Sequence, residues 1–83
     1  MYGYGSHFDK RLEERFGWDW KLLLEESRGL KYEMFKTSKE LEDKYSGFGQ
    51  IIRNNETSIH IVRELNILMI RVGFEWKTCY RVY

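Results

Sequence analysis

Two arginines, a histidine and a tyrosine near the end of the chain have the side chains best suited to bind an anion. If this part of the chain is extended, alternation places His60, Arg71, Arg81 and Tyr83 on one outward face of a sheet. Two guanidinium groups can hold a phosphate or carboxylate through paired hydrogen bonds, and a His or Tyr beside them can move a proton or stack on a base. The alternative interpretation is a row of solvent-facing residues paired with nearby glutamates.

The fold of residues 54–83 decides whether this cluster forms. A helix over 57–72 has one clean apolar stripe, but it exposes three isoleucines and contains many β-branched residues. Extended chain is favoured, because Leu68, Ile70 and Val72 alternate on one apolar face. The pattern therefore predicts strands at 57–64, 67–75 and 79–83.

Turn lengths give this meander a register. A two-residue turn at 65–66 places Ile61 opposite Ile70. A three-residue turn at 76–78 places Val82 beside Val72. In this register Arg71 and Arg81 lie close together, and we expect them to form a joint anion-binding surface.

Earlier in the chain, the period of the apolar residues predicts helix, strand and helix. An apolar stripe runs from Phe8 to Leu23, either as one helix or as two helices joined at Gly17-Trp18, the second capped by Asp19. Residues 30–36 alternate like a strand. A Thr-x-x-Glu capping box at 37–40 begins a helix over about 38–53, which either breaks near Ser46 or uses its glycines for close packing.

Together these elements predict an α+β domain over residues 1–83, with residues 1–5 flexible. Two helices pack on a small antiparallel sheet, in the order helix-strand-helix-strand-strand-strand. The alternative is a winged helix-turn-helix. The longest uncharged apolar run is too short to span a membrane, and neither a secretory signal nor a pair of cysteines is present, which indicates a cytoplasmic protein.

Aromatic residues are more abundant than one small core requires. Fourteen of the 83 residues are aromatic, and Tyr2, Tyr4, Trp18 and Tyr83 lie off the apolar stripes or at the chain ends. Exposed Trp, Tyr and Arg residues dominate many protein interfaces, because they bury a large area while few rotatable bonds are fixed. The alternative interpretation is an aromatic-rich core with a frayed N-terminus.

Catalytic, cofactor-binding and metal-ligating patterns give no candidate residues. His7 and His60 have no partner at a spacing that recurs in metal sites, and Cys79 is the single cysteine. Gly47-Phe48-Gly49 lacks the Lys-Ser or Lys-Thr of a phosphate loop. The formal net charge of +1 supplies no global attraction to nucleic acid. The sequence therefore predicts no enzyme site and no cofactor.

Residues 67–80, Ile-Leu-Met-Ile-Arg-Val-Gly-Phe-Glu-Trp-Lys-Thr-Cys-Tyr, resemble the last strands of RelE-type ribonuclease toxins. That resemblance covers under a fifth of the chain. It implies cleavage of messenger RNA, with Arg71 and Arg81 as phosphate clamps and Tyr80 or Tyr83 near the 2′-hydroxyl.

The helical alternative resembles a winged helix-turn-helix over about half of the chain. Thr37-Ser38-Lys39-Glu40-Leu41 is similar to its second helix and residues 62–68 to its recognition helix. Gly73-Phe74 together with Tyr80-Arg81-Val82 is similar to its wing. This resemblance implies a DNA-binding regulator.

Taken together, the residues favour a small non-enzymatic binding protein. We expect an inhibitor, or a host- or defence-modulating protein of a phage or other mobile element, that occludes a surface of a partner protein or nucleoprotein complex. The candidate contact residues are Tyr2, Tyr4, Trp18, His60, Arg71, Arg81 and Tyr83. Nucleic-acid contact and a homodimer are both compatible with these residues, and a membrane partner is not expected.

Overall fold

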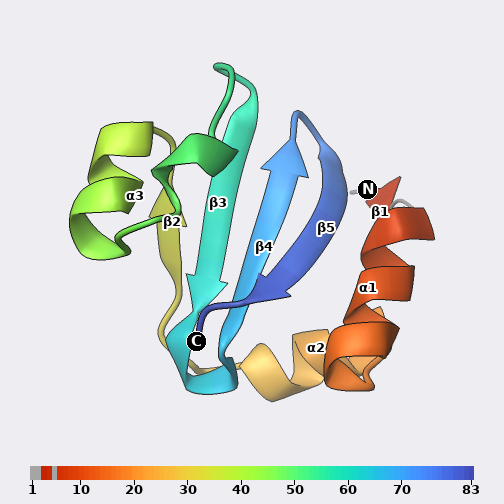
Figure 1. Ribbon diagram of the computed structural model, residues 1–83. Helices are drawn as coiled ribbons and strands as arrows, with labels where there is room; N and C mark the ends of the chain where they lie inside the picture. The colour runs from red at the N-terminus through yellow and green to blue at the C-terminus, as the bar shows by residue number, and fades with distance from the viewer. Residues whose placement is uncertain (1–2, 5) are drawn as a thin grey trace.

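The computed structural model describes residues 3–4 and 6–83, and it confirms the α+β class (Figure 1). The described residues form a five-stranded sheet with its strands in the order β1-β5-β4-β3-β2. The bounds of the strands are Gly3–Tyr4 for β1, Glu33–Phe35 for β2, Thr57–Val62 for β3, Ile67–Val72 for β4 and Glu75–Arg81 for β5. Strands β2 to β5 are antiparallel, whereas β1 pairs in parallel with β5.

The first apolar stripe forms two helices, as the interpretation with a joint at Gly17 requires. Helix α1 spans Ser6–Phe16 and helix α2 spans Trp20–Ser27. Gly17 has a φ of +71°, a backbone conformation that favours glycine, and it ends α1. The Asp19 side chain then accepts a hydrogen bond from the Leu22 N–H and caps α2.

The second predicted helix is shorter than expected. Helix α3 spans Ser38–Lys44, and Thr37 caps it by accepting a hydrogen bond from the Glu40 N–H, so the predicted N-terminus is confirmed. The chain then turns at Gly47, where φ is +95°, and continues as the short 3₁₀ helix η1 over Gly49–Ile51. The prediction of helix up to residue 53 is therefore wrong, and the break near Ser46 is what the structure has.

Strands β3 and β4 occupy the segment that the winged-helix alternative needs as a helix, so that alternative is not supported. Their register differs from the expected one, because Ile61 lies opposite Leu68 rather than Ile70. The cause is a longer turn, in which the 3₁₀ helix η2 (Arg63–Leu65) is followed by Asn66 at a φ of +58°. A displacement of two residues leaves each side chain on its predicted face.

The sheet separates two apolar clusters. On one face α3 and η1 cover β2 and β3, with Leu41 and Tyr45 packed among residues such as Ile59 and Leu68. On the other face α1 and α2 pack through Phe8, Leu12 and Leu23 against Val62, Ile67, Met69 and Cys79. Helical elements therefore lie on both faces of the sheet, although α3 and η1 lie mainly over β2 and β3. None of the helices in the described residues is long and apolar enough to cross a membrane.

Candidate functional site

The sheet face that carries His60 lies beneath α1 and α2, so the prediction that His60 faces solvent is wrong. His60 is 1% exposed, and its ring nitrogens hydrogen-bond to the Tyr32 hydroxyl through Nδ1 and to the Ser58 hydroxyl through Nε2, the latter at 2.8 Å. Desolvation by burial, together with the positive charges of Arg71 and Lys36, lowers the pKa of His60 to about 4. His60 is neutral at pH 7 and is part of the interior.

Arg71 and Arg81 lie at different ends of β4 and β5. Arg71 pairs with Trp76 across the two strands, whereas Arg81 pairs with Ile67. These pairs are four residues apart along β4, or about 13 Å at the rise of a strand. The predicted convergence of the two arginines is wrong, because the hairpin turns at Gly73 rather than at 76–78. The two guanidinium groups therefore do not form one phosphate clamp.

Arg81 is instead brought together with Trp18. The Trp18 ring stacks on Phe16 with centroids 5.3 Å apart, and the Arg81 guanidinium lies 4.9 Å from the centre of the same Phe16 ring. Arg81 Nη2 also donates a hydrogen bond to the Arg15 carbonyl oxygen, at the C-terminal end of α1, where carbonyls lack helical partners. Arg81 thus joins the end of β5 to the end of α1.

Arg15 adds a second contact of this type. Its guanidinium lies 4.5 Å above the Tyr80 ring, and Nη1 donates a hydrogen bond of 2.6 Å to the Cys79 carbonyl oxygen. We call the group formed by Arg15, Phe16, Trp18, Tyr80 and Arg81 the Arg-aromatic cluster.

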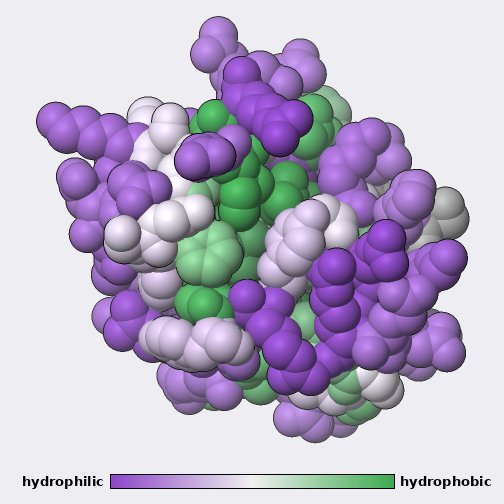
Figure 2. All heavy atoms as spheres, viewed as in Figure 1, coloured by the Kyte–Doolittle hydropathy of each residue, from purple (hydrophilic) through white to green (hydrophobic). Residues whose placement is uncertain are grey.

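A groove of about 500 Å³ lies beside this cluster, on the face of the sheet that α3 and η1 cover only in part. Its described apolar and aromatic lining residues are Phe48, Ile51, Ile70 and Tyr80, and Gly47, Arg53 and Arg81 also line it. Figure 2 shows apolar side chains gathered near the middle of this face, surrounded by hydrophilic ones. We call this hollow the β4–β5 groove.

The groove and the cluster carry positive charge that no ion pair among the described residues offsets. Arg53 and Arg81 line the groove, Arg15 lies on Tyr80, and none of the described residues in the lining is a carboxylate. Elsewhere Arg11, Lys44 and Lys77 form ion pairs with Glu14, Glu33 and Glu75. Within residues 3–4 and 6–83, no such pair involves Arg15, Arg53 or Arg81. The site is therefore suited to an anionic group beside an apolar one.

The predicted tyrosines have different places. Tyr2 lies outside the described residues, and Tyr4 is placed only by its backbone in β1. The Tyr83 side chain is 78% exposed, and its backbone N–H donates a hydrogen bond of 2.9 Å to Asn66 Oδ1. Of the seven predicted contact residues, Trp18 and Arg81 therefore belong to the cluster.

Sequence reasoning did not select Arg15, Arg53 or Phe48, and it named Tyr80 only through the resemblance to ribonuclease toxins. Arg15 lies on the helix that precedes the break at Gly17, and Arg53 follows the turn at Gly47, so neither has a local signal that places it near β5. For Tyr80, alternation along the strand predicts only that its side chain lies on the opposite face from its neighbours Cys79 and Arg81.

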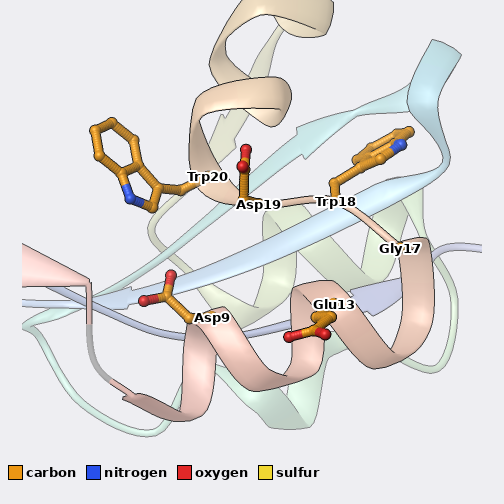
Figure 3. Close-up of a pocket in the computed structure, with 6 residues that line it drawn as sticks. All are labelled: Asp9, Glu13, Gly17, Trp18, Asp19 and Trp20. Atoms are coloured by element: carbon orange, nitrogen blue, oxygen red, sulfur yellow. The ribbon is translucent and has the colours of Figure 1, made fainter.

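A second hollow, of about 440 Å³, has the opposite charge (Figure 3). The carboxylates of Asp9, Glu13 and Asp19 line it together with Trp18 and Trp20. Figure 3 shows the two indole rings pointing in opposite directions, so they do not enclose a cation between them. Asp19 is already engaged as the cap of α2. These features favour a solvated acidic edge.

The structure also shows the surroundings of the Cys79 thiol and of the side chains that could bind a metal ion. Burial raises the pKa of the Cys79 thiol to about 11, although the nearby Arg15 acts in the opposite direction, so the sulfur stays protonated at pH 7. In the part of the chain that the structure describes, no three His, Cys, Asp or Glu side chains are grouped as ligands for a metal ion.

Comparison of the chain with protein-family models, with curated proteins and with solved structures gives no significant match.

Proposed function

We propose that this chain is a small binding protein without chemistry of its own, which acts by covering a functional surface of a partner protein. The β4–β5 groove and the Arg-aromatic cluster are the contact surface in this proposal. The partner segment carries one large apolar side chain, which enters the groove, and flanking acidic residues, which meet Arg53 and Arg81.

The observation that carries the proposal is the combination of an apolar hollow with two arginines in its lining, Arg53 and Arg81, that form no ion pair among the described residues. Phe48 and Ile51 are partly buried and Tyr80 is 38% exposed, so contact with a partner would remove apolar surface of these residues from water. Arg53 and Arg81 sit where acidic groups would be bound and oriented, and Arg is enriched among residues that dominate binding energy.

A protein partner is favoured over nucleic acid. Single-stranded nucleic acids bind to proteins by stacking their bases on exposed aromatic rings along a positively charged groove. Here Phe16 already contacts Trp18 and Arg81, and Arg15 lies over the Tyr80 ring. The net charge of +1 and the acidic hollow near α1 also oppose a long phosphate track. An inhibitor encoded by a phage or other mobile element is the setting we propose, on the basis of size and composition alone.

Selection from a random peptide library displayed on phage tests the proposed partner chemistry. The wild-type chain should enrich peptides in which Asp or Glu flanks Trp, Phe, Leu or Ile. Binding of an enriched peptide should weaken at least about tenfold in the double variant Arg53→Ala/Arg81→Ala, and the loss should shrink in 1 M salt, because screening removes the charge contribution.

The matched control is Lys39→Ala, which removes an exposed cation from α3, away from the groove. It should leave the affinity for the peptide unchanged. Enrichment of basic peptides, or equal binding by the double variant, would contradict the proposal. A fluorescent twelve-nucleotide poly(dT) serves as the nucleic-acid probe, and tight, steeply salt-dependent binding of it would favour nucleic acid instead.

A further inference from the structure

A small apolar pocket lies between α2 and the sheet, on the face opposite to the β4–β5 groove. Its volume is about 160 Å³, and its buried residues are Leu23, Val62 and Met69. Leu24 and Tyr32 also line the pocket and are 49% and 52% exposed, so the pocket is reached from solvent at their side. We call this hollow the α2 pocket.

From this pocket we infer a binding site for a neutral aromatic molecule of one ring or two fused rings that carries one hydrogen-bond donor. Phenol and indole represent this class. The inference is independent of the proposed partner binding, because the two sites lie on opposite faces of the sheet and have no described lining residue in common.

The size and the lining select an aromatic ligand. An apolar cavity of about 150 Å³ stays dry and binds benzene in other proteins, so a volume of about 160 Å³ suits a ring of similar size. Trp76 and Tyr32 contribute aromatic surface to the lining, and Met69 contributes a thioether. Rings attract other rings edge to face, and sulfur packs favourably at ring edges.

The absence of charge in the lining selects a neutral ligand. Besides its apolar and aromatic residues, the pocket is lined by Ser27, and the described lining contains no acidic or basic side chain. A carboxylate or an ammonium group would be desolvated there without an ionic partner, which is costly. This distinguishes the α2 pocket from the groove, where Arg53 and Arg81 favour an anion.

A hydrogen-bonded chain in the interior supplies the polar contact. The Ser58 hydroxyl lies 2.8 Å from His60 Nε2, and His60 Nδ1 hydrogen-bonds to the Tyr32 hydroxyl. The Tyr32 side chain is thereby fixed where it lines the α2 pocket. Because a phenolic oxygen both donates and accepts, it can accept a hydrogen bond from the O–H of phenol or the N–H of indole.

Titration of the folded chain with phenol and with toluene, followed by NMR of the methyl groups, tests the inference. Phenol should shift the Met69 and Val62 methyl signals with a dissociation constant of about 1 mM or tighter, and it should leave Ile70, on the opposite face, unchanged. Tyr32→Phe should weaken phenol binding about tenfold and leave toluene binding unchanged, since only the hydroxyl is removed.

Ser27→Leu places a larger apolar side chain in the lining and should reduce phenol binding at least about tenfold. The matched control is Glu26→Leu, an exposed neighbour on α2 that does not line the pocket. Thermal unfolding of each variant identifies those that are folded. The inference is overturned if phenol gives no saturable shift up to 10 mM, or if folded Ser27→Leu binds phenol as the wild type does. Equal losses of phenol and toluene in folded Tyr32→Phe would overturn the hydrogen bond to Tyr32.

Discussion

The buried imidazole of His60 makes the stability of this domain depend on pH in a calculable way. The folded state holds His60 with a pKa of about 4, below its ordinary value of 6.5, because burial and the charges of Arg71 and Lys36 disfavour its protonated form. As the pH falls through 6.5, the unfolded chain takes up this proton and the folded chain does not. The contribution is therefore fully present above pH 6.5 and is lost progressively down to about pH 4.

The magnitude follows from the two pKa values. The difference between 6.5 and about 4 corresponds to a loss of about 3 kcal/mol in the free energy of unfolding over the full titration. Between pH 7 and pH 5 the loss from His60 alone should be about 2 kcal/mol. That is a large part of the stability of a domain of this size.

Urea unfolding at pH 7, 6 and 5, followed by circular dichroism, measures this loss. His60→Gln keeps a polar side chain but cannot titrate, so about 2 kcal/mol of the pH dependence should disappear. The other histidine, His7, is exposed, and His7→Gln should behave as the wild type. Backbone N–H groups of Gly47 and Gly49 lower the pKa of Glu42, which also costs stability on acidification, but equally in all three proteins.

The comparison between variants is therefore the decisive result. If His60→Gln and the wild type lose the same free energy of unfolding between pH 7 and pH 5, the imidazole is not held neutral by the fold. The hydrogen-bonded chain from Ser58 to Tyr32 would then have to be open to protonation in the native state.

Three further substitutions or reactions test the packing. Asn66→Ala should lower the free energy of unfolding by about 2 to 3 kcal/mol in urea titrations. Alanine is strained at this left-handed position, and the variant loses the two hydrogen bonds that the backbone N–H groups of Val82 and Tyr83 donate to Asn66 Oδ1. Asn66→Gly loses the same hydrogen bonds without the strain, so it should cost less. Gly49→Ala should cost about 1 to 3 kcal/mol in the same assay, since its Cβ would lie 2.9 Å from Glu42 Oε1 and 3.0 Å from the Ser38 carbonyl oxygen. A thiol reagent at pH 8 should label Cys79 only as fast as the domain unfolds, and rapid labelling in native buffer would contradict its burial.

Alternation of apolar residues is a local property of the chain, and it correctly predicted extended chain at 57–62 and 67–72, but it placed the last strand at 79–83 rather than at Glu75–Arg81. It did not determine their register. The turn between β4 and β5 forms at Gly73, whose φ is +61°, as expected for glycine at the first position of a two-residue hairpin turn. A glycine at this position, as in residues 72–75, is a signal for such a turn, whereas the predicted turn at 76–78 contains no residue that favours a positive φ.

The covering of both sheet faces also had a signal in the sequence. Val62 and Met69 are apolar and share the face of His60, and a strand that is apolar on both faces is typical of a sheet covered on both sides. Which helices provide that cover depends on contacts between distant segments. The same reason explains why the groove could not be predicted, since it combines η1 with residues of β4 and β5.

The arrangement of the outer strands restricts how copies of this chain can join their sheets. Beside β5, Gly3 and Tyr4 pair with Glu75 and Trp76. Farther along the same strand, the Arg15 side chain donates a hydrogen bond to the Cys79 carbonyl oxygen. An incoming strand would have to displace both, so this border is protected against edge-to-edge aggregation. The opposite border of the sheet is β2, where a strand from another copy could pair. Because β2 is three residues long, it offers little length for the strand pairing of a fibril.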